Sequence, residues 1–369
     1  MTVRLMLMDV GELAGLLGEF AGAEYGELRY HERLANAVAV RKGELETASS
    51  GSYSGVGVRA LVGGKWGFSA TSRPAREELK AAIHAAVQMA KAQQGGAGRT
   101  AKLAPVKLAI GTYKTEINDP FSNHPIEERL ELVKAADLRA RKSSPLVRSA
   151  SCRFSELADT KIICTTDGAR AVIEDAKSVF AVFVVAAEGT NISEGYEACG
   201  ASGGWKDLFR RRGPEEIVDL VTGRAIRLLK ADFPRGEQAT VILDPSIVGL
   251  IAHEAIGHTV EADLVMAGAA TKGKIGTRVA SDLVTLADSG PSVHEQGAGG
   301  VVLVDDEGVV TGRTAVIENG ILKSYLHNRE SAEIFGVAPT GNARAFEYSS
   351  EPIIRMRNTY IEPGHAKME

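Results

Sequence analysis

Dipeptides that favour tight turns constrain the fold of this chain more than any other feature. Gly63-Gly64, Asp167-Gly168 and Asn319-Gly320 each separate two segments in which apolar residues alternate with polar ones. Such dipeptides adopt the positive φ angles of β-hairpin turns, and a period of two is typical of strands. Glycine, at 40 residues, is abundant enough to supply many turns of this kind. The pattern predicts antiparallel sheets with several hairpins.

Helical patterns are fewer than the strand patterns. Residues 73–94, 124–142 and 213–231 carry apolar side chains at helical spacing, and residues 245–264 follow Asp244, a good N-cap before a proline. Helices and strands do not alternate regularly, and no repeat of roughly 20–50 residues is present. We therefore expect an α+β fold with mixed or antiparallel sheets, a few long helices and a strand-rich C-terminal unit that carries the last of these helices.

The order of these patterns predicts three units, separated by stretches without periodic apolar residues. Residues 1–100 are expected to form strands followed by a helix, residues 105–232 a second α+β unit, and residues 236–369 the third. The principal expected strands are 36–48, 55–70, 158–166, 169–176, 178–189 and 239–244.

Composition narrows the classes of protein to consider. Lys and Arg total 43 against 47 Asp and Glu, and the resulting net charge of −4 argues against a broad nucleic-acid or anionic-membrane surface. The three cysteines, Cys152, Cys164 and Cys199, form no paired motif, which suits a reducing cytosol. The longest apolar run, within residues 178–187, is far shorter than the roughly 20 residues of a membrane span, and no secretory signal pattern is present. We expect a cytoplasmic protein that binds neither membrane nor nucleic acid.

The stretch HEAIGHTVEADLV, residues 253–265, contains the strongest candidate site. In the zinc-peptidase motif H-E-x-x-H the two histidines are four positions apart, about 40° from one common helix face. His253 and His258 are five positions apart, which places their rings about 140° apart on a straight α-helix. A π-bulge would return both rings to nearly one face, and Gly257 makes local distortion easier. The spacing therefore predicts a bulged or interrupted helix.

The residue types in this stretch suit metal-assisted hydrolysis. His253 and His258 are candidate metal ligands, and Glu254 follows the first of them, where a carboxylate can take a proton from a metal-bound water. Glu261 and Asp263 are either partners for the free N–H of a ligand imidazole or solvated acids at a helix end. The alternative from the pattern alone is a structural histidine pair on an amphipathic helix.

Five segments carry the most specific residue patterns, in this order: GVGVRALVGGKWGFSA (55–70), HEAIGHTVEAD (253–263), DDEG (305–308), PTGNARAFEYSSEP (339–352) and RMRNTYIEPG (355–364). Together they resemble the TldD/PmbA peptidases, an old description of which is modulator of DNA gyrase. The resemblance covers essentially the whole chain and implies a metallopeptidase that acts on unfolded or flexible polypeptides. It implies that His253 and His258 are zinc ligands and that Glu254 is the catalytic residue. The acidic balance gives no support to a direct action on DNA.

The resemblance also implies a partner protein. The family pairs a motif-bearing TldD-type subunit with a PmbA-type subunit that lacks the motif, and this chain resembles the TldD-type member because it keeps the motif. We expect a heterodimer with a PmbA-type subunit or a homo-oligomer. The alternative function is a metal-free, non-catalytic subunit that binds peptides or serves as a scaffold.

One departure from the family concerns the third zinc ligand. Members usually run on for about a hundred residues past the R-M-x-N-T-Y segment and supply a cysteine there, whereas this chain stops at Glu369. None of its own cysteines matches that position. Either the chain is truncated, or it is a short form that uses a substitute ligand or no metal, with His294, His327 and His365 as the conceivable substitutes. Catalytic zinc normally takes three protein ligands, so two histidines alone would bind it weakly.

Overall fold

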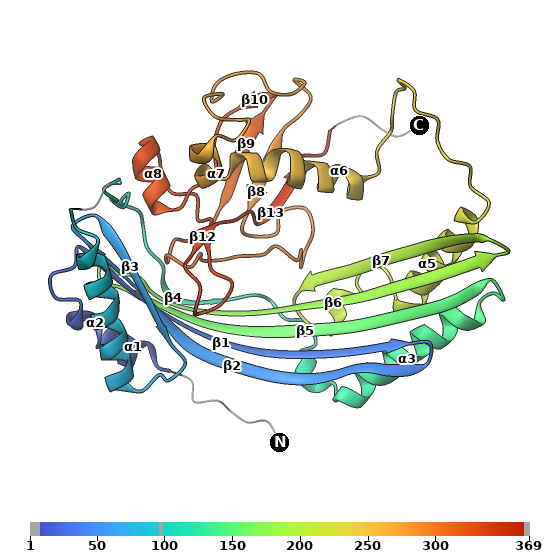
Figure 1. Ribbon diagram of the computed structural model, residues 1–369, viewed down its shortest axis with the longest axis horizontal. Helices are drawn as coiled ribbons and strands as arrows, with labels where there is room; N and C mark the ends of the chain where they lie inside the picture. The colour runs from blue at the N-terminus through green and yellow to red at the C-terminus, as the bar shows by residue number, and fades with distance from the viewer. Residues whose placement is uncertain (1–7, 96–98, 365–369) are drawn as a thin grey trace.

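A long curved sheet dominates the computed structural model, which describes residues 8–95 and 99–364 (Figure 1). Its seven strands follow the order β3-β2-β1-β5-β6-β4, and β7 pairs with the remaining length of β6. All neighbouring strands are antiparallel except β4 and β6, which are parallel, so the expected mixed α+β fold is confirmed. The strands are β1 (Tyr25–Arg41), β2 (Glu44–Val62), β3 (Lys65–Thr71), β4 (Ile110–Lys114), β5 (Val147–Thr165), β6 (Arg170–Glu188) and β7 (Asn191–Ser202).

The turn dipeptides occupy hairpins, as expected. Gly63 and Gly64 join β2 to β3 with φ angles of 57° and 71°, and Gly168 lies in the turn between β5 and β6 with φ 126°. These angles are open to glycine and strained for most other residues. The two expected strands 169–176 and 178–189 are one continuous strand, β6, because the alternation of buried and exposed positions runs past Lys177.

Two hydrophobic cores lie at opposite ends of this sheet (Figure 1). Two helices cover one end, where the helix of Leu79 and Ile83 packs on β2 and β3 and both side chains are fully buried, and two others cover the opposite end. β1 pairs with β5 from Glu27 to Arg41, so one hydrogen-bonded sheet joins strands of the first two expected units. The unit boundaries themselves stay a prediction. The helices are α1 (Val10–Ala14) and α2 (Arg76–Ala92) at the first end, and α3 (Ile126–Lys142) and α5 (Pro214–Leu228) at the second.

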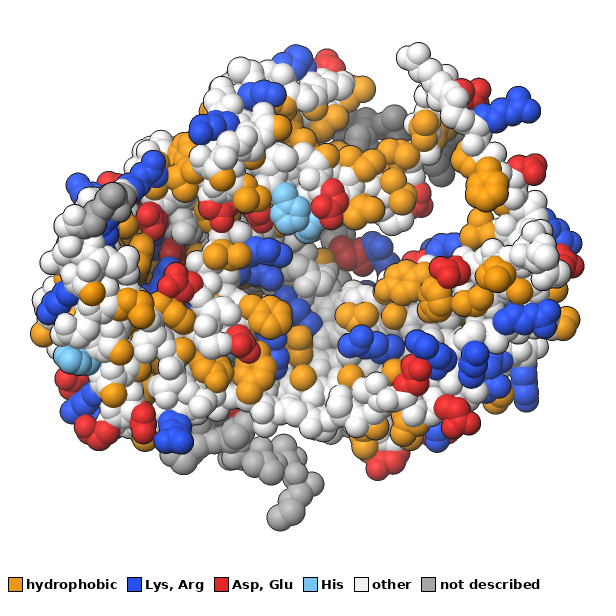
Figure 2. All heavy atoms as spheres, viewed as in Figure 1, with side chains coloured by type: hydrophobic (Ala, Val, Ile, Leu, Met, Phe, Trp, Pro, Cys, Tyr) orange, Lys and Arg blue, Asp and Glu red, His pale blue; other side chains and the backbone are white. Residues whose placement is uncertain are grey.

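Residues 245–364, called the third unit below, lie over the concave face of the long sheet (Figure 1). A small sheet of order β10-β9-β8-β13 packs against the helices that carry the candidate site, and Figure 2 shows a hollow between this unit and the long sheet. None of the helices in the described part of the chain combines the length and apolar character needed to cross a lipid bilayer. The strands are β8 (Leu286–Ser289), β9 (Arg313–Glu318), β10 (Ile321–Leu322), β11 (Ala343–Arg344), β12 (Ile353–Ile354) and β13 (Asn358–Ile361), and helix α8 spans Arg329–Phe335.

The prediction of a strand at residues 239–244 is wrong. These residues belong to no strand, and Val241 and Ile242 are 68% and 89% exposed. A run of apolar residues shows that a segment suits a sheet, whereas a strand also needs a neighbour to supply hydrogen bonds. No strand in residues 8–95 or 99–364 pairs with this segment.

The DDEG segment, residues 305–308, fastens the third unit to the long sheet, and we call it the junction loop. The Asp306 carboxylate accepts hydrogen bonds from Lys161 of β5 at 2.8 and 3.0 Å. The Glu307 carboxylate accepts one from Arg59 of β2 at 3.0 Å. Asp305 instead shapes the loop, since its side chain accepts three backbone N–H groups. All three acids are at most 2% exposed.

Candidate metal centre

The candidate site lies on a helix that changes its winding at the histidines. The Asp244 side chain accepts a hydrogen bond from the Ser246 N–H at 2.8 Å and so caps α6 (Pro245–Ile251). A π-helical turn follows over Ala252–Gly257, then a 3₁₀ turn over His258–Val260, and then α7 (Ala262–Ala267). The prediction of a bulged or interrupted helix is confirmed.

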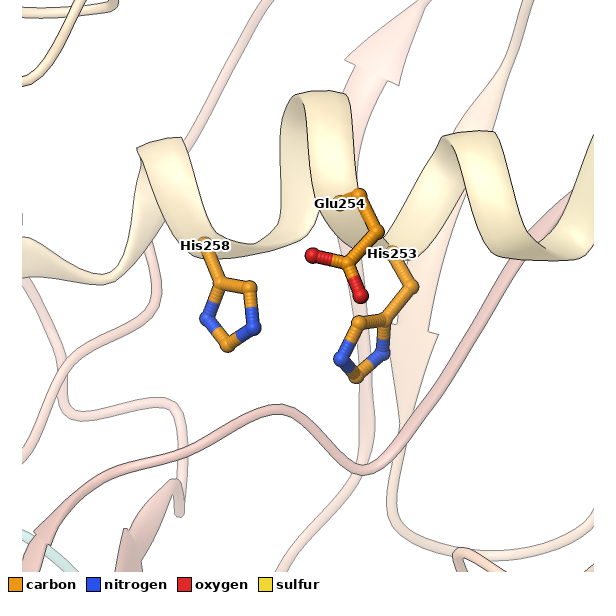
Figure 3. A group of neighbouring side chains, drawn as sticks. All are labelled: His253, Glu254 and His258. Atoms are coloured by element: carbon orange, nitrogen blue, oxygen red, sulfur yellow. The ribbon is translucent and has the colours of Figure 1, made fainter.

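The π-helical turn brings the three candidate groups together. Ligand atoms of His253, Glu254 and His258 all lie within 4.8 Å of one another. The two imidazole rings are 4.9 Å apart between centroids, with their planes at 86°, and Figure 3 shows the three side chains on the same side of the helix. A π-helical turn advances by about one residue more than an α-turn, so residues five apart share a face. The spacing of the motif therefore matches this backbone.

Gly257 serves close packing rather than backbone freedom. Its φ of −52° and ψ of −55° are helical angles that any residue adopts. A Cβ atom at this position would overlap the Sδ atom of Met356, which is buried against the turn. Sequence reasoning assigned Gly257 to helix distortion and missed this contact, because Met356 is 99 positions away in the sequence. Glycine therefore lets the segment of Met356 approach the site.

Glu261 holds the ring of His258. Its Oε2 lies 3.0 Å from Nδ1 of His258, and its Oε1 accepts the backbone N–H of Met356 at 3.3 Å. Glu261 is 3% exposed, so this carboxylate is fixed between two donors. An ionised carboxylate requires a hydrogen on Nδ1, which leaves the lone pair of Nε2 free for a metal ion. Of the two acids considered from the sequence, Asp263 plays no such part: it accepts the N–H of Leu264 at the start of α7.

The cysteines lie in the sheet cores and not at the candidate site. Cys152 and Cys164 are buried in β5, and burial raises the pKa of their thiols to about 12 and about 11. Cys199 in β7 is half-buried, and its thiol lies 3.6 Å from the Phe180 carbonyl oxygen. Burial also raises the pKa of Cys199. A high pKa opposes the thiolate form that binds zinc.

The histidines considered as substitute ligands have other partners. His294 lies 2.6 Å from the Glu362 carboxylate. His327 is buried beside Ser331, with its Nδ1 3.0 Å from the Ser331 hydroxyl, and burial lowers its pKa to about 4. His365 falls outside the described residues. Among the residues that the structure describes, His253, Glu254 and His258 form the one group able to hold a metal ion.

The ligand atoms of His253, Glu254 and His258 are of the types that bind zinc. Imidazole nitrogen and carboxylate oxygen are both zinc ligands, and the free Nε2 of His258 faces the same space as His253 and Glu254. Catalytic zinc uses three protein ligands and one open position. The two histidines supply two of the three, and Glu254 either completes the set or stays free to move protons. A group of this kind is typical of metal-dependent hydrolases.

Comparisons with known proteins agree with this class. Sequence patterns of the PmbA/TldA metallopeptidases match along the chain: domain 1 at residues 26–90, the central domain at residues 119–229 and the C-terminal domain at residues 236–369. The metalloprotease MJ0996 of Methanocaldococcus jannaschii is 36% identical over 350 residues, which cover 94% of this chain and 75% of that protein. The zinc metalloprotease TldD homolog of Saccharolobus solfataricus is 28% identical over 350 residues, which cover 95% of this chain and 75% of that protein. The chain belongs to the PmbA/TldA, or TldD/PmbA, family of metallopeptidases.

Solved structures share the fold. A putative modulator of DNA gyrase from Bacteroides thetaiotaomicron superposes with a TM-score of 0.78 at 18% identity, over 97% of this chain and 78% of that one. TldE from Thermococcus kodakarensis gives a TM-score of 0.73 at 19% identity, over 96% of this chain and 78% of that one. At these identities the likeness defines the fold.

Proposed function

We propose that this protein is a zinc-dependent peptidase that hydrolyses peptide bonds of unfolded or flexible polypeptides. The observation that carries the proposal is the π-helical turn, which gathers His253, Glu254 and His258 on one side of the helix. The relatives named metalloproteases support a peptidase. Those names do not favour the alternative of a metal-free, non-catalytic binding or scaffold subunit.

In the proposed mechanism His253 and His258 would hold the zinc ion, and Glu254 would move the proton. When bound there, a zinc ion would supply Lewis acidity toward the scissile carbonyl and the attacking water. The Glu254 carboxylate is exposed beside both rings, where it accepts a proton from that water and returns it to the leaving amine. Glu261 fixes the His258 tautomer, so Nε2 stays available throughout.

The third protein ligand and the assembly complete the proposal. We propose a cysteine as the third ligand, and it is not one of the three cysteines of these 369 residues, because those lie in β5 and β7 and not at the site. The structural likeness to TldE supports a complex of the TldD/TldE kind. A PmbA-type subunit or a second copy of this chain is therefore the proposed partner, a peptide the proposed substrate, and the cytoplasm the proposed location.

The substitution Glu254→Gln tests the general base. It keeps the size of the side chain and removes its basicity, so we expect peptide hydrolysis to fall roughly 10²- to 10⁴-fold while zinc content stays unchanged. Hydrolysis and bound zinc are measured with and without the PmbA-type partner. Glu333→Gln, at an exposed position of α8, is the matched control and should leave both values unchanged. Hydrolysis at the original rate in Glu254→Gln would reject the assignment.

A further inference from the structure

A cavity of about 300 Å³ lies in the hollow between the long sheet and the third unit. Strands β1, β5 and β6 form its floor, and segments 301–304 and 344–346 of the third unit form its walls. The volume is at the lower end of the roughly 300–1,000 Å³ of ligand-binding pockets. Figure 2 shows Lys and Arg side chains in this hollow, facing the third unit.

Most charges of this cavity are already paired. Four cations and three carboxylates line it, and three of the cations each have a carboxylate partner. Paired charges contribute little attraction for a further ion, because each partner cancels the other's field. The pairs are Arg33 with Asp159 at 2.6 Å, Lys161 with Asp306 at 2.8 Å, and Lys177 with Asp175 at 3.3 Å.

Arg344, the fourth cation, is different. Within the described part of the chain no carboxylate lies at ion-pair distance from its guanidinium group, whose one hydrogen bond goes from Nη1 to the Met356 carbonyl at 2.6 Å. Burial lowers the pKa of Arg344, Asp306 opposes this effect, and the positive charge of Arg355 adds to it. A half-buried guanidinium with unused N–H donors is a site for a carboxylate, which it can bind through two parallel hydrogen bonds.

Met356 connects this guanidinium to the metal centre. Its carbonyl accepts from Arg344, its N–H donates to Glu261, and its side chain fills the space at Gly257. A single residue therefore contacts both the guanidinium group of Arg344 and the segment that carries the histidines. Phe346, which also lines the cavity, is 77% exposed and offers an apolar surface beside it.

We propose that Arg344 binds a carboxylate of the peptide substrate and that Phe346 contacts the neighbouring apolar side chain. This inference rests on the proposed peptidase function and names a substrate class for it: peptides that present an anionic group next to the cleaved region. The carboxylate comes either from a free C-terminus or from an Asp or Glu side chain. Both sources offer the same planar acceptor to the guanidinium fork.

Binding of three labelled peptides distinguishes these sources. The peptides share one neutral sequence and end in a free carboxylate, in an amide, or in an amide with a glutamate placed near that end. Fluorescence anisotropy is measured on the Glu254→Gln chain with its PmbA-type partner, so that hydrolysis does not consume the probe. We expect at least one anionic peptide to bind about tenfold more tightly than the neutral one. The peptide that gains identifies the source of the carboxylate.

Substitutions at Arg344 assign the effect to this residue. Arg344→Gln should abolish the preference and leave binding of the neutral peptide unchanged, and Arg344→Lys should keep part of the preference. Arg355→Gln is the matched control, because Arg355 is exposed and its removal takes away the same charge without touching the cavity. A preference that survives Arg344→Gln overturns the proposal.

The failures of the two proposals are distinguishable. Equal binding of all three peptides overturns the role of Arg344 and leaves the peptidase function standing. The absence of both peptide binding and peptide hydrolysis overturns the peptidase function and the role of Arg344 with it. The comparison of the three peptides needs no change at position 344, so equal binding overturns the proposal even if Arg344→Gln fails to fold, and Arg344→Lys is then the variant that assigns a preference to this residue.

Discussion

The candidate metal centre and the junction loop are both clusters of ionisable residues in the third unit. They differ in how many of their polar atoms already have hydrogen-bond partners. Asp305, Asp306 and Glu307 are buried, and each carboxylate accepts hydrogen bonds from cations or backbone N–H groups. At the metal centre Glu254 is exposed and His258 keeps a free Nε2. Saturated buried charges hold segments together, whereas accessible lone pairs on fixed side chains are available for chemistry.

The largest effect on stability is expected when the junction loop loses its cationic partner Arg59. Arg59 is buried between Glu27 and Glu307, at 2.7 and 3.0 Å. Arg59→Met leaves two carboxylates buried without their partner, so we expect the free energy of unfolding to fall by about 3–5 kcal/mol. Urea unfolding measures this value. Arg139→Met removes an exposed pair with Asp219 and should change stability far less. Equal losses in the two variants would contradict the distinction between saturated and exposed charges.

Acid should weaken the junction loop through Asp306. Burial favours the neutral acid, but Lys161 and Arg29 overcome this and lower the pKa of Asp306 from 3.8 to about 2. A lowered folded-state pKa means that the stabilisation is complete above pH 4 and is lost as the pH falls toward 2, by about 2 kcal/mol. Urea unfolding between pH 5 and pH 2.5 compares the original chain with Asp306→Asn. The variant should lose less stability over this range, and superimposable pH profiles would refute the assignment.

The smallest effect is expected from a substitution of Glu261, the residue that holds the ring of His258 in the candidate metal centre. Glu261→Ala removes the acceptor that fixes His258, so we expect zinc affinity to fall about tenfold. Glu261→Gln should retain part of the affinity, because an amide oxygen still accepts the Nδ1 hydrogen. Calorimetric titration with zinc measures affinity, and nitrogen NMR shifts of the His258 ring report the tautomer. Unchanged affinity and an unchanged tautomer in Glu261→Ala would show that the ring needs no such support.

Local geometry was predictable from the sequence, and contacts between distant segments were not. The spacing of His253 and His258 predicted a bulged helix because backbone geometry fixes the angle between positions. The hairpin at Gly63-Gly64 followed from φ preferences in the same way. The expected strand 239–244 failed because pairing depends on residues elsewhere in the chain. The position of Met356 beside Gly257 depends on tertiary packing, although its segment had already matched the family pattern.

The long sheet also has a mechanical consequence. Strands β1 and β5 pair without interruption from Glu27 to Arg41 and run from one core to the other. Bending there would stretch a continuous ladder of hydrogen bonds. The third unit is tied to that sheet by the junction loop and by an extended, exposed segment at residues 231–244. Hinge motion that admits or releases a ligand is therefore expected at the exposed segment 231–244, with the sheet as a stiff floor and the junction loop as a fixed contact.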